Sequence, residues 1–116
     1  MVTDIIIESR LQNRRMIIDT KFTGIFTRSA YREAILKSGY LYQIYAYLRS
    51  QERAEDSLSA NAEGILLHPA IDADVDETVR IQGHDIRFLT IDLAKPTHEI
   101  IARLRSIPQS GSFAAF

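Results

Sequence analysis

Cysteine is absent from this chain of 116 residues. Its absence excludes disulfides, thiolate metal sites and cysteine catalysis, so any bound metal must be held by oxygen or imidazole ligands. The chain also lacks an apolar run long enough to cross a bilayer, and it lacks the pattern of a signal peptide. No membrane role is indicated, and we expect a cytoplasmic protein.

A large net charge is also lacking. The formal value of −1 gives no indication of nucleic-acid binding by itself, but its distribution is uneven. Residues 1–50 carry eight Lys/Arg and four Asp/Glu (net +4), whereas residues 51–116 carry six and eleven (net −5). A basic half can attract phosphates. A solvated surface with a chance asymmetry explains the same counts equally well.

Hydrophobic patterning predicts one α/β domain over 1–107, followed by a flexible tail over 108–116. The β-branched segments 2–8 and 15–22 are expected to form a hairpin. A helix over about 40–54 is expected because apolar residues recur at the spacing of one buried face, namely Leu41, Ile44, Tyr45 and Leu48. The remaining expected elements are a short helix over about 30–37, a strand over 64–68 stopped by Pro69, paired strands over 78–83 and 85–93, and a helix from Pro96 to about Ser106. This order favours a mixed sheet.

Asp19 and Lys21 are the strongest local signal for chemistry. They end an apolar strand, and residues two apart on a strand project to the same face, so Thr20 projects away from them. The carboxylate can hold Mg²⁺, which prefers oxygen ligands. The ammonium can position the attacking water or neutralise developing charge. The alternative is a surface ion pair, worth about 0–1 kcal/mol.

Asp4 adds a second carboxylate. It lies among apolar residues of the first expected strand, where an unpaired carboxylate is costly. In a hairpin, the start of the first strand lies near the end of the second, which predicts that Asp4 approaches Asp19 and Lys21. Two converging carboxylates indicate a cation between them. The alternative is a buried Asp4 paired with an arginine such as Arg28 or Arg32.

Gln43 and Tyr47 are the third element. They are four residues apart on the expected helix and therefore share one face. They could hydrogen-bond catalytic groups or a DNA phosphate, although a polar helix face would be the better explanation if the pair stood alone. The three histidines, His68, His84 and His98, show no metal-binding spacing. For His68 we expect packing, although its place at a strand end leaves open a position near the site, and for His84 we expect a turn. We expect the tyrosines in the core or at the sheet–helix interface, although one could touch a sugar or base.

In this order, these elements resemble the PD-(D/E)xK nuclease superfamily, especially members with a Gln-x-x-x-Tyr helix. The closest resemblance is to the McrC nuclease family, the nuclease subunits of McrBC modification-dependent restriction systems specific for 5-methylcytosine. It covers about residues 1–70. The segments that carry it are Met1-x-Thr3-Asp4-Ile5, Ile18-Asp19-Thr20-Lys21-Phe22, Ser38-Gly39-x-Leu41-Tyr42-Gln43-Ile44-Tyr45-Ala46-Tyr47-Leu48 and Gly64-x-Leu66-Leu67-His68-Pro69.

The resemblance implies a restriction-endonuclease-like mixed sheet with flanking helices and Mg²⁺-dependent hydrolysis of DNA phosphodiester bonds. Asp4 and Asp19 would bind the metal, and the Thr20 backbone carbonyl would add a ligand. Lys21 would orient or activate the water. Gln43 would support the site from the helix, with Tyr47 as a weaker candidate. The implied partners are DNA and an McrB-like GTP-driven AAA+ motor, in defence against foreign DNA.

The sequence departs from the superfamily at its start. The helix that usually precedes the first catalytic strand, with its acidic residue, is missing before Asp4, and so is the larger N-terminal part of McrC. We therefore expect an N-terminally truncated domain whose exposed sheet invites self-association. Two alternatives stay open: an inactive remnant that binds DNA or a protein partner, and a related exonuclease or recombination-type nuclease.

Overall fold

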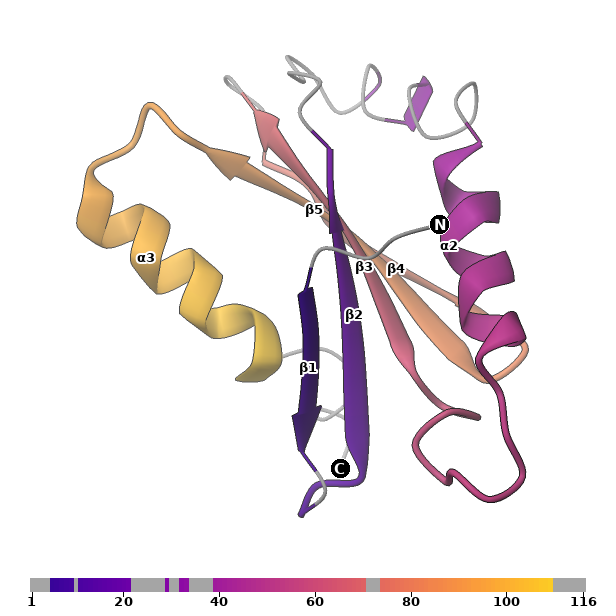
Figure 1. The fold of residues 1–116 in the computed structure, drawn as a ribbon. Helices are drawn as coiled ribbons and strands as arrows, with labels where there is room; N and C mark the ends of the chain where they lie inside the picture. The colour runs from indigo at the N-terminus through magenta and orange to yellow at the C-terminus, as the bar shows by residue number, and fades with distance from the viewer. Residues whose placement is uncertain are drawn as a thin grey trace.

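The computed structural model describes residues 5–9, 11–21, 29, 32–33, 39–70 and 74–109. Its centre is a five-stranded mixed sheet with strand order β1-β2-β3-β5-β4. Figure 1 shows α2 and α3 on opposite sides of this sheet. The elements are β1 Ile5–Ser9, β2 Arg14–Thr20, α2 Tyr40–Ser50, β3 Glu63–Ala70, β4 Asp76–Ile81, β5 His84–Asp92, α3 Thr97–Ser106 and the 3₁₀ helix η1 Ile107–Gln109. The predicted mixed α/β fold is confirmed.

The first two strands form the expected antiparallel hairpin. Ile5 pairs with Ile18 and Ser9 with Arg14, so β1 begins beside the end of β2. β2 then pairs with β3 in parallel, and β3 pairs with β5 in parallel. Because these three strands run the same way, their carboxyl ends meet at one edge of the sheet.

Helix α2 covers the sheet over β3 and β5. Ile44 and Leu48 are fully buried there, with Leu41 and Tyr45 packed partly against the same cluster. The apolar face expected from spacing is therefore the packed face. The helix ends at Ser50, four residues before the expected end, where the Gln51 N–H donates to Tyr47 O and Leu48 O.

Strand β3 corrects one expectation, because Pro69 does not stop it. The strand continues to Ala70, and Pro69 pairs with Ile91. The Lys21 N–H donates to Leu67 O, so the backbone groups of Leu67 and of Pro69, two residues on, face β2. Strand β2 ends at Thr20, opposite Leu67. The N–H that proline lacks therefore falls beyond the last residue of β2, and no hydrogen bond of the strand ladder is lost.

The second hairpin and α3 complete the fold. Strands β4 and β5 pair antiparallel around Gln82 and Gly83, which have φ of 48° and 89° and so provide the left-handed backbone of a tight hairpin. On the face opposite α2, Ile107 packs with Met16, Ile18, Ile65 and Leu89. The Arg14 guanidinium joins this end of the chain to the sheet by pairing with Glu63 and donating to Pro108 O at 3.0 Å.

Some expectations fall on residues that the structure does not describe. Of the helix expected over 30–37, only Arg32 and Glu33 are described, and both are helical, as is Ser29. The tail expected over 108–116 begins inside η1, and residues 110–116 lie outside the described part. Among the described residues, no helix has the length and hydrophobicity needed to cross a membrane.

Candidate functional site

Asp19 and Lys21 lie together at the carboxyl edge of the parallel strands. Asp19 is the penultimate residue of β2, and Lys21 follows the strand directly. The Lys21 Nζ is 2.9 Å from Asp19 Oδ2, with the lysine side chain 22% and the aspartate side chain 6% exposed. The predicted projection of both side chains to one face is confirmed by this contact. A buried carboxylate beside a partly exposed ammonium is a stronger feature than a solvated surface pair.

The alternation of β2 explains why this carboxylate is buried. Ile17, on the same face as Asp19, belongs to the core beneath α2, whereas Met16 and Ile18 pack on the opposite face. Asp19 therefore continues an apolar row at the point where the strand leaves the core. Its Oδ2 is buried, and the Lys21 ammonium pairs with it at 2.9 Å.

Two aromatic side chains adjoin this pair: Tyr40, expected in the core or at the sheet–helix interface, and His68, for which a place near the site is the alternative to packing. The Lys21 Nζ lies 4.5 Å from the centroid of the Tyr40 ring. That ring in turn lies 5.9 Å from the His68 ring, tilted by 38°. Tyr40 begins α2, and His68 lies on β3, so three elements converge. The alternation of β3 through Gly64 and Leu66 could have predicted that His68 lies on the face covered by α2. Only the pairing of β3 with β2 brings it close to Lys21.

His68 is fully buried, and its pKa is lowered to about 4. Burial is the main cause, the Lys21 charge adds to it, and the Asp19 charge opposes it. The imidazole is therefore neutral near pH 7, so it brings no second positive charge to the site. The burial agrees with the packing role expected for His68. The ring packs against Tyr40, the residue that also contacts Lys21.

Asp4 lies outside the described residues, so the predicted meeting of Asp4 with Asp19 stays a prediction. The hairpin register describes only the residues next to the two aspartates. Ile5 pairs with Ile18. These two residues directly follow Asp4 and directly precede Asp19 in the sequence.

Thr20 projects away from Asp19 and Lys21, as expected. By the alternation of β2 it lies on the face of Met16 and Ile18. A mainly apolar cavity of about 160 Å³ at this end of the sheet is lined by Thr20, Lys21, Leu67, His68, Pro69, Ile91 and Leu93. Because the Lys21 backbone faces β3, the alternating backbone of Thr20 faces the β1 side. The carbonyl predicted as a metal ligand thus points toward the β1 side of the sheet.

Gln43 and Tyr47 share one side of α2 but differ in burial. Gln43 is exposed, and its backbone N–H donates to Gly39 O. Tyr47 is half-buried and lines a groove of about 290 Å³ with Ile6 and Ile17, between α2 and the first hairpin. Neither side chain has a recorded hydrogen bond to Asp19 or Lys21, so the supporting role of Gln43 stays a prediction.

The donor set fits one divalent ion only in part. Asp19 Oδ2 is a buried carboxylate oxygen of the kind that a hard cation prefers, although the Lys21 ammonium already pairs with it. Within the ranges that the structure covers, no group of three His, Asp or Glu side chains could hold a metal. A complete site therefore needs ligands from beyond these ranges, from water or from a substrate phosphate.

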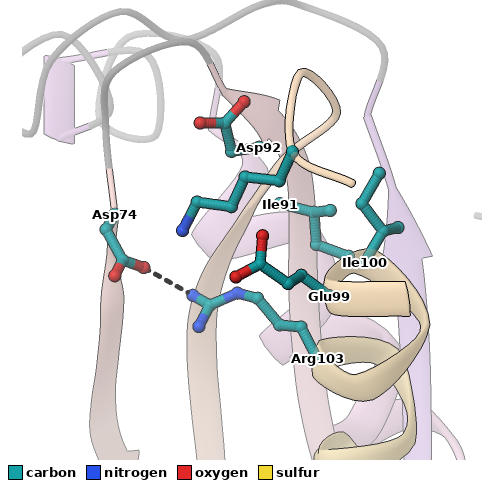
Figure 2. A pocket seen from close by; sticks show the side chains of 7 residues that line it. Asp74, Ile91, Asp92, Glu99, Ile100 and Arg103 are labelled. Atoms are coloured by element: carbon teal, nitrogen blue, oxygen red, sulfur yellow. Dashed lines mark ion pairs between the residues drawn. The ribbon is translucent and has the colours of Figure 1, made fainter. Parts of the chain in front are cut away.

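A separate cavity of about 270 Å³ lies between the end of β5 and α3. Figure 2 shows Asp74 and Glu99 beside Arg103 at this cavity, while the Asp92 carboxylate, which also lines it, points away from them and accepts from the Ala94 N–H at 2.9 Å. Arg103 is already held, because it pairs with Asp74 at 2.9 Å and donates to Thr90 O at 2.8 Å. The cavity shares only its Ile91 wall with the Thr20-lined cavity and does not include Asp19 or Lys21.

His84 has a structural position that the sequence did not reveal. The expected turn position is wrong, because His84 is the first residue of β5, after the turn at Gln82 and Gly83, and its ring is fully buried. The ring nitrogens lie 2.7 Å from Ala62 O and 2.8 Å from Glu52 Oε2, which ties the second hairpin to the segment after α2.

No family model matches the chain, and a search of curated proteins finds no significant match.

Proposed function

We propose that this chain is the nuclease domain of a PD-(D/E)xK enzyme of the McrC type, with a restriction-endonuclease-like sheet, and that it hydrolyses DNA phosphodiester bonds with Mg²⁺. The observation that carries the proposal is the Asp19–Lys21 pair, buried on its carboxylate side, at the carboxyl end of parallel strands. Open α/β sheets commonly bind ligands at this edge.

The two side chains suit complementary roles. Asp19, with the Thr20 carbonyl and Asp4, would hold the metal. Lys21 would hold the attacking water or neutralise charge on the phosphate as it develops. The ion supplies a Lewis acid and lowers the pKa of bound water. Gln43, exposed near the amino end of α2, is proposed to support the site or to contact the DNA.

The partners follow from the resemblance alone. We propose that an McrB-like GTP-driven motor recognises modified DNA and that this domain then cuts it, in a cytoplasmic restriction system against foreign DNA. The neighbouring genes give a direct check, because such a system requires an AAA+ GTPase gene beside this one.

The first prediction concerns cleavage. Incubation of plasmid DNA with Mg²⁺, with and without the motor, is expected to give nicked or linear product for the native chain. Asp19→Asn removes the charge that holds the ion, and Lys21→Met removes the ammonium. Each is expected to lower the cleavage rate by about 100-fold or more. The rate is measured from product bands over time.

Matched control variants show whether a loss of cleavage comes from the site itself or from the change in the net charge of the chain. Asp74→Asn and Lys95→Met make the same changes at exposed positions beside the other cavity and are expected to keep the native rate. Calorimetric titration with Mg²⁺ should lose its heat in Asp19→Asn alone. Equal cleavage by the native chain and Asp19→Asn would contradict the proposal.

A second candidate is a nuclease-fold remnant that binds DNA or a protein without cutting. The neutralisation of Asp19 by Lys21 favours it, because this ion pair accounts for the buried carboxylate without any metal. The remnant predicts no Mg²⁺ heat and no cleavage with the motor present, together with DNA binding in a gel-shift assay.

A further inference from the structure

We infer that Tyr40 is a positioning residue that holds the Lys21 ammonium beside Asp19. The inference concerns the placement of Lys21, and its consequence for catalysis rests on the proposed function. It starts from a cation held between two different partners. Lys21 Nζ is 2.9 Å from Asp19 Oδ2 and 4.5 Å from the Tyr40 ring centroid. An ammonium is attracted to the face of an aromatic ring at such distances.

The Tyr40 ring is itself held in place. Tyr40 is the first residue of α2, after Gly39, whose φ of 73° sets the left-handed entry to the helix. Added bulk at Gly39 would meet nothing within 4 Å, so its backbone conformation is what favours glycine there. The His68 ring, fully buried on β3, lies against the Tyr40 ring at 5.9 Å. The aromatic contact is therefore fixed from both the helix and the sheet.

The two partners of Lys21 respond differently to a divalent cation. An ion on the Asp19 carboxylate competes with the lysine for the same oxygen. The Tyr40 ring is neutral and does not compete for that ion in the same way. Tyr40 would thus keep the ammonium at the site when Asp19 is engaged, within reach of the water or phosphate on which it is proposed to act.

The first experiment measures where the Lys21 side chain lies. In the full chain, the NMR shifts of the Lys21 ε-methylene protons report its place over the ring, because an aromatic ring current shifts protons above its face. The native chain and Tyr40→Phe, which keeps the ring, are expected to share the displaced shift. Tyr40→Leu is expected to lose it. Tyr42→Leu is the matched control, since Tyr42 lies on the same helix and is 79% exposed.

Kinetics then test the consequence. Tyr40→Leu is expected to lower kcat about three- to tenfold without weakening DNA binding, Tyr40→Phe to restore kcat, and Tyr42→Leu to leave it unchanged. Thermal unfolding of each variant shows that the fold is retained. A Lys21 shift unaltered in Tyr40→Leu overturns the inference. An equal fall of kcat in Tyr40→Phe also overturns it. If the native chain does not cut DNA, the proposed function fails, and the NMR comparison still decides whether Tyr40 holds Lys21.

Discussion

At the scale of single residues, the site combines one buried charge with one buried neutral base. Asp19 is 5% exposed and is neutralised by Lys21, while His68 is fully buried on the adjacent strand. A buried ion pair stabilises a fold little in net terms, since desolvation offsets the attraction. The pair is therefore better explained by a requirement for charge at this place than by a requirement for stability.

His68 predicts a pH dependence of stability. Its pKa falls from 6.5 to about 4 on folding. Between these values the unfolded chain binds more protons, so the free energy of unfolding is expected to fall as the pH is lowered from about 6.5 toward 4. The slope for one group is at most about 1.4 kcal/mol per pH unit. Urea unfolding at pH 7, 6 and 5 without divalent ions measures it.

His68→Phe keeps a ring against Tyr40 and removes the titrating nitrogens. It is expected to flatten the dependence of stability on pH between 6.5 and 5, where few carboxylates titrate. An unchanged slope in this variant would assign the proton uptake to a group other than His68.

At the scale of elements, the contact of α2 with β3 depends on a glycine. A Cβ at Gly64 would lie 2.8 Å from Ile44 Cδ1 and 3.2 Å from Leu48 Cδ1. Both isoleucine and leucine are fully buried, so neither can move out into solvent. The close approach of the helix to the strand is thus set by the absence of a side chain at one position.

Gly64→Ala is expected to destabilise the chain by about 1–3 kcal/mol through overpacking. Ile44→Val removes the methyl group nearest to the new Cβ, so Gly64→Ala combined with Ile44→Val is expected to recover part of the loss. Urea unfolding of the single and double variants measures the coupling. Strict additivity of the two changes would contradict the predicted contact.

At the scale of the whole molecule, β1 forms an edge of the sheet. Among the described strands it pairs with β2 alone. Ile5 and Ile6 are 47% and 53% exposed on this strand. Exposed apolar edge strands favour pairing with another chain. The self-association expected from the sequence therefore stays a proposal, with β1 as its contact.

Sedimentation velocity at rising protein concentration tests this proposal. The native chain is expected to show a concentration-dependent dimer, and Ile6→Lys to shift it toward monomer by placing a charge on the edge. Leu11→Lys is the matched control, because Leu11 is 98% exposed in the turn after β1. A native chain that sediments as a monomer throughout would remove the proposal.

The sequence by itself determined the elements with strong local patterns. The β1–β2 hairpin, the buried face of α2 and the common face of Asp19 and Lys21 all follow from periods of 2 and 3.6 residues, which depend only on neighbouring residues. The tertiary structure decided the features that depend on how distant strands and helices pair. Pro69 stays inside β3 because β2 has already ended, and Tyr40 and His68 reach Lys21 because three elements meet at one edge. Such contacts join residues far apart in the chain, and no local period encodes them.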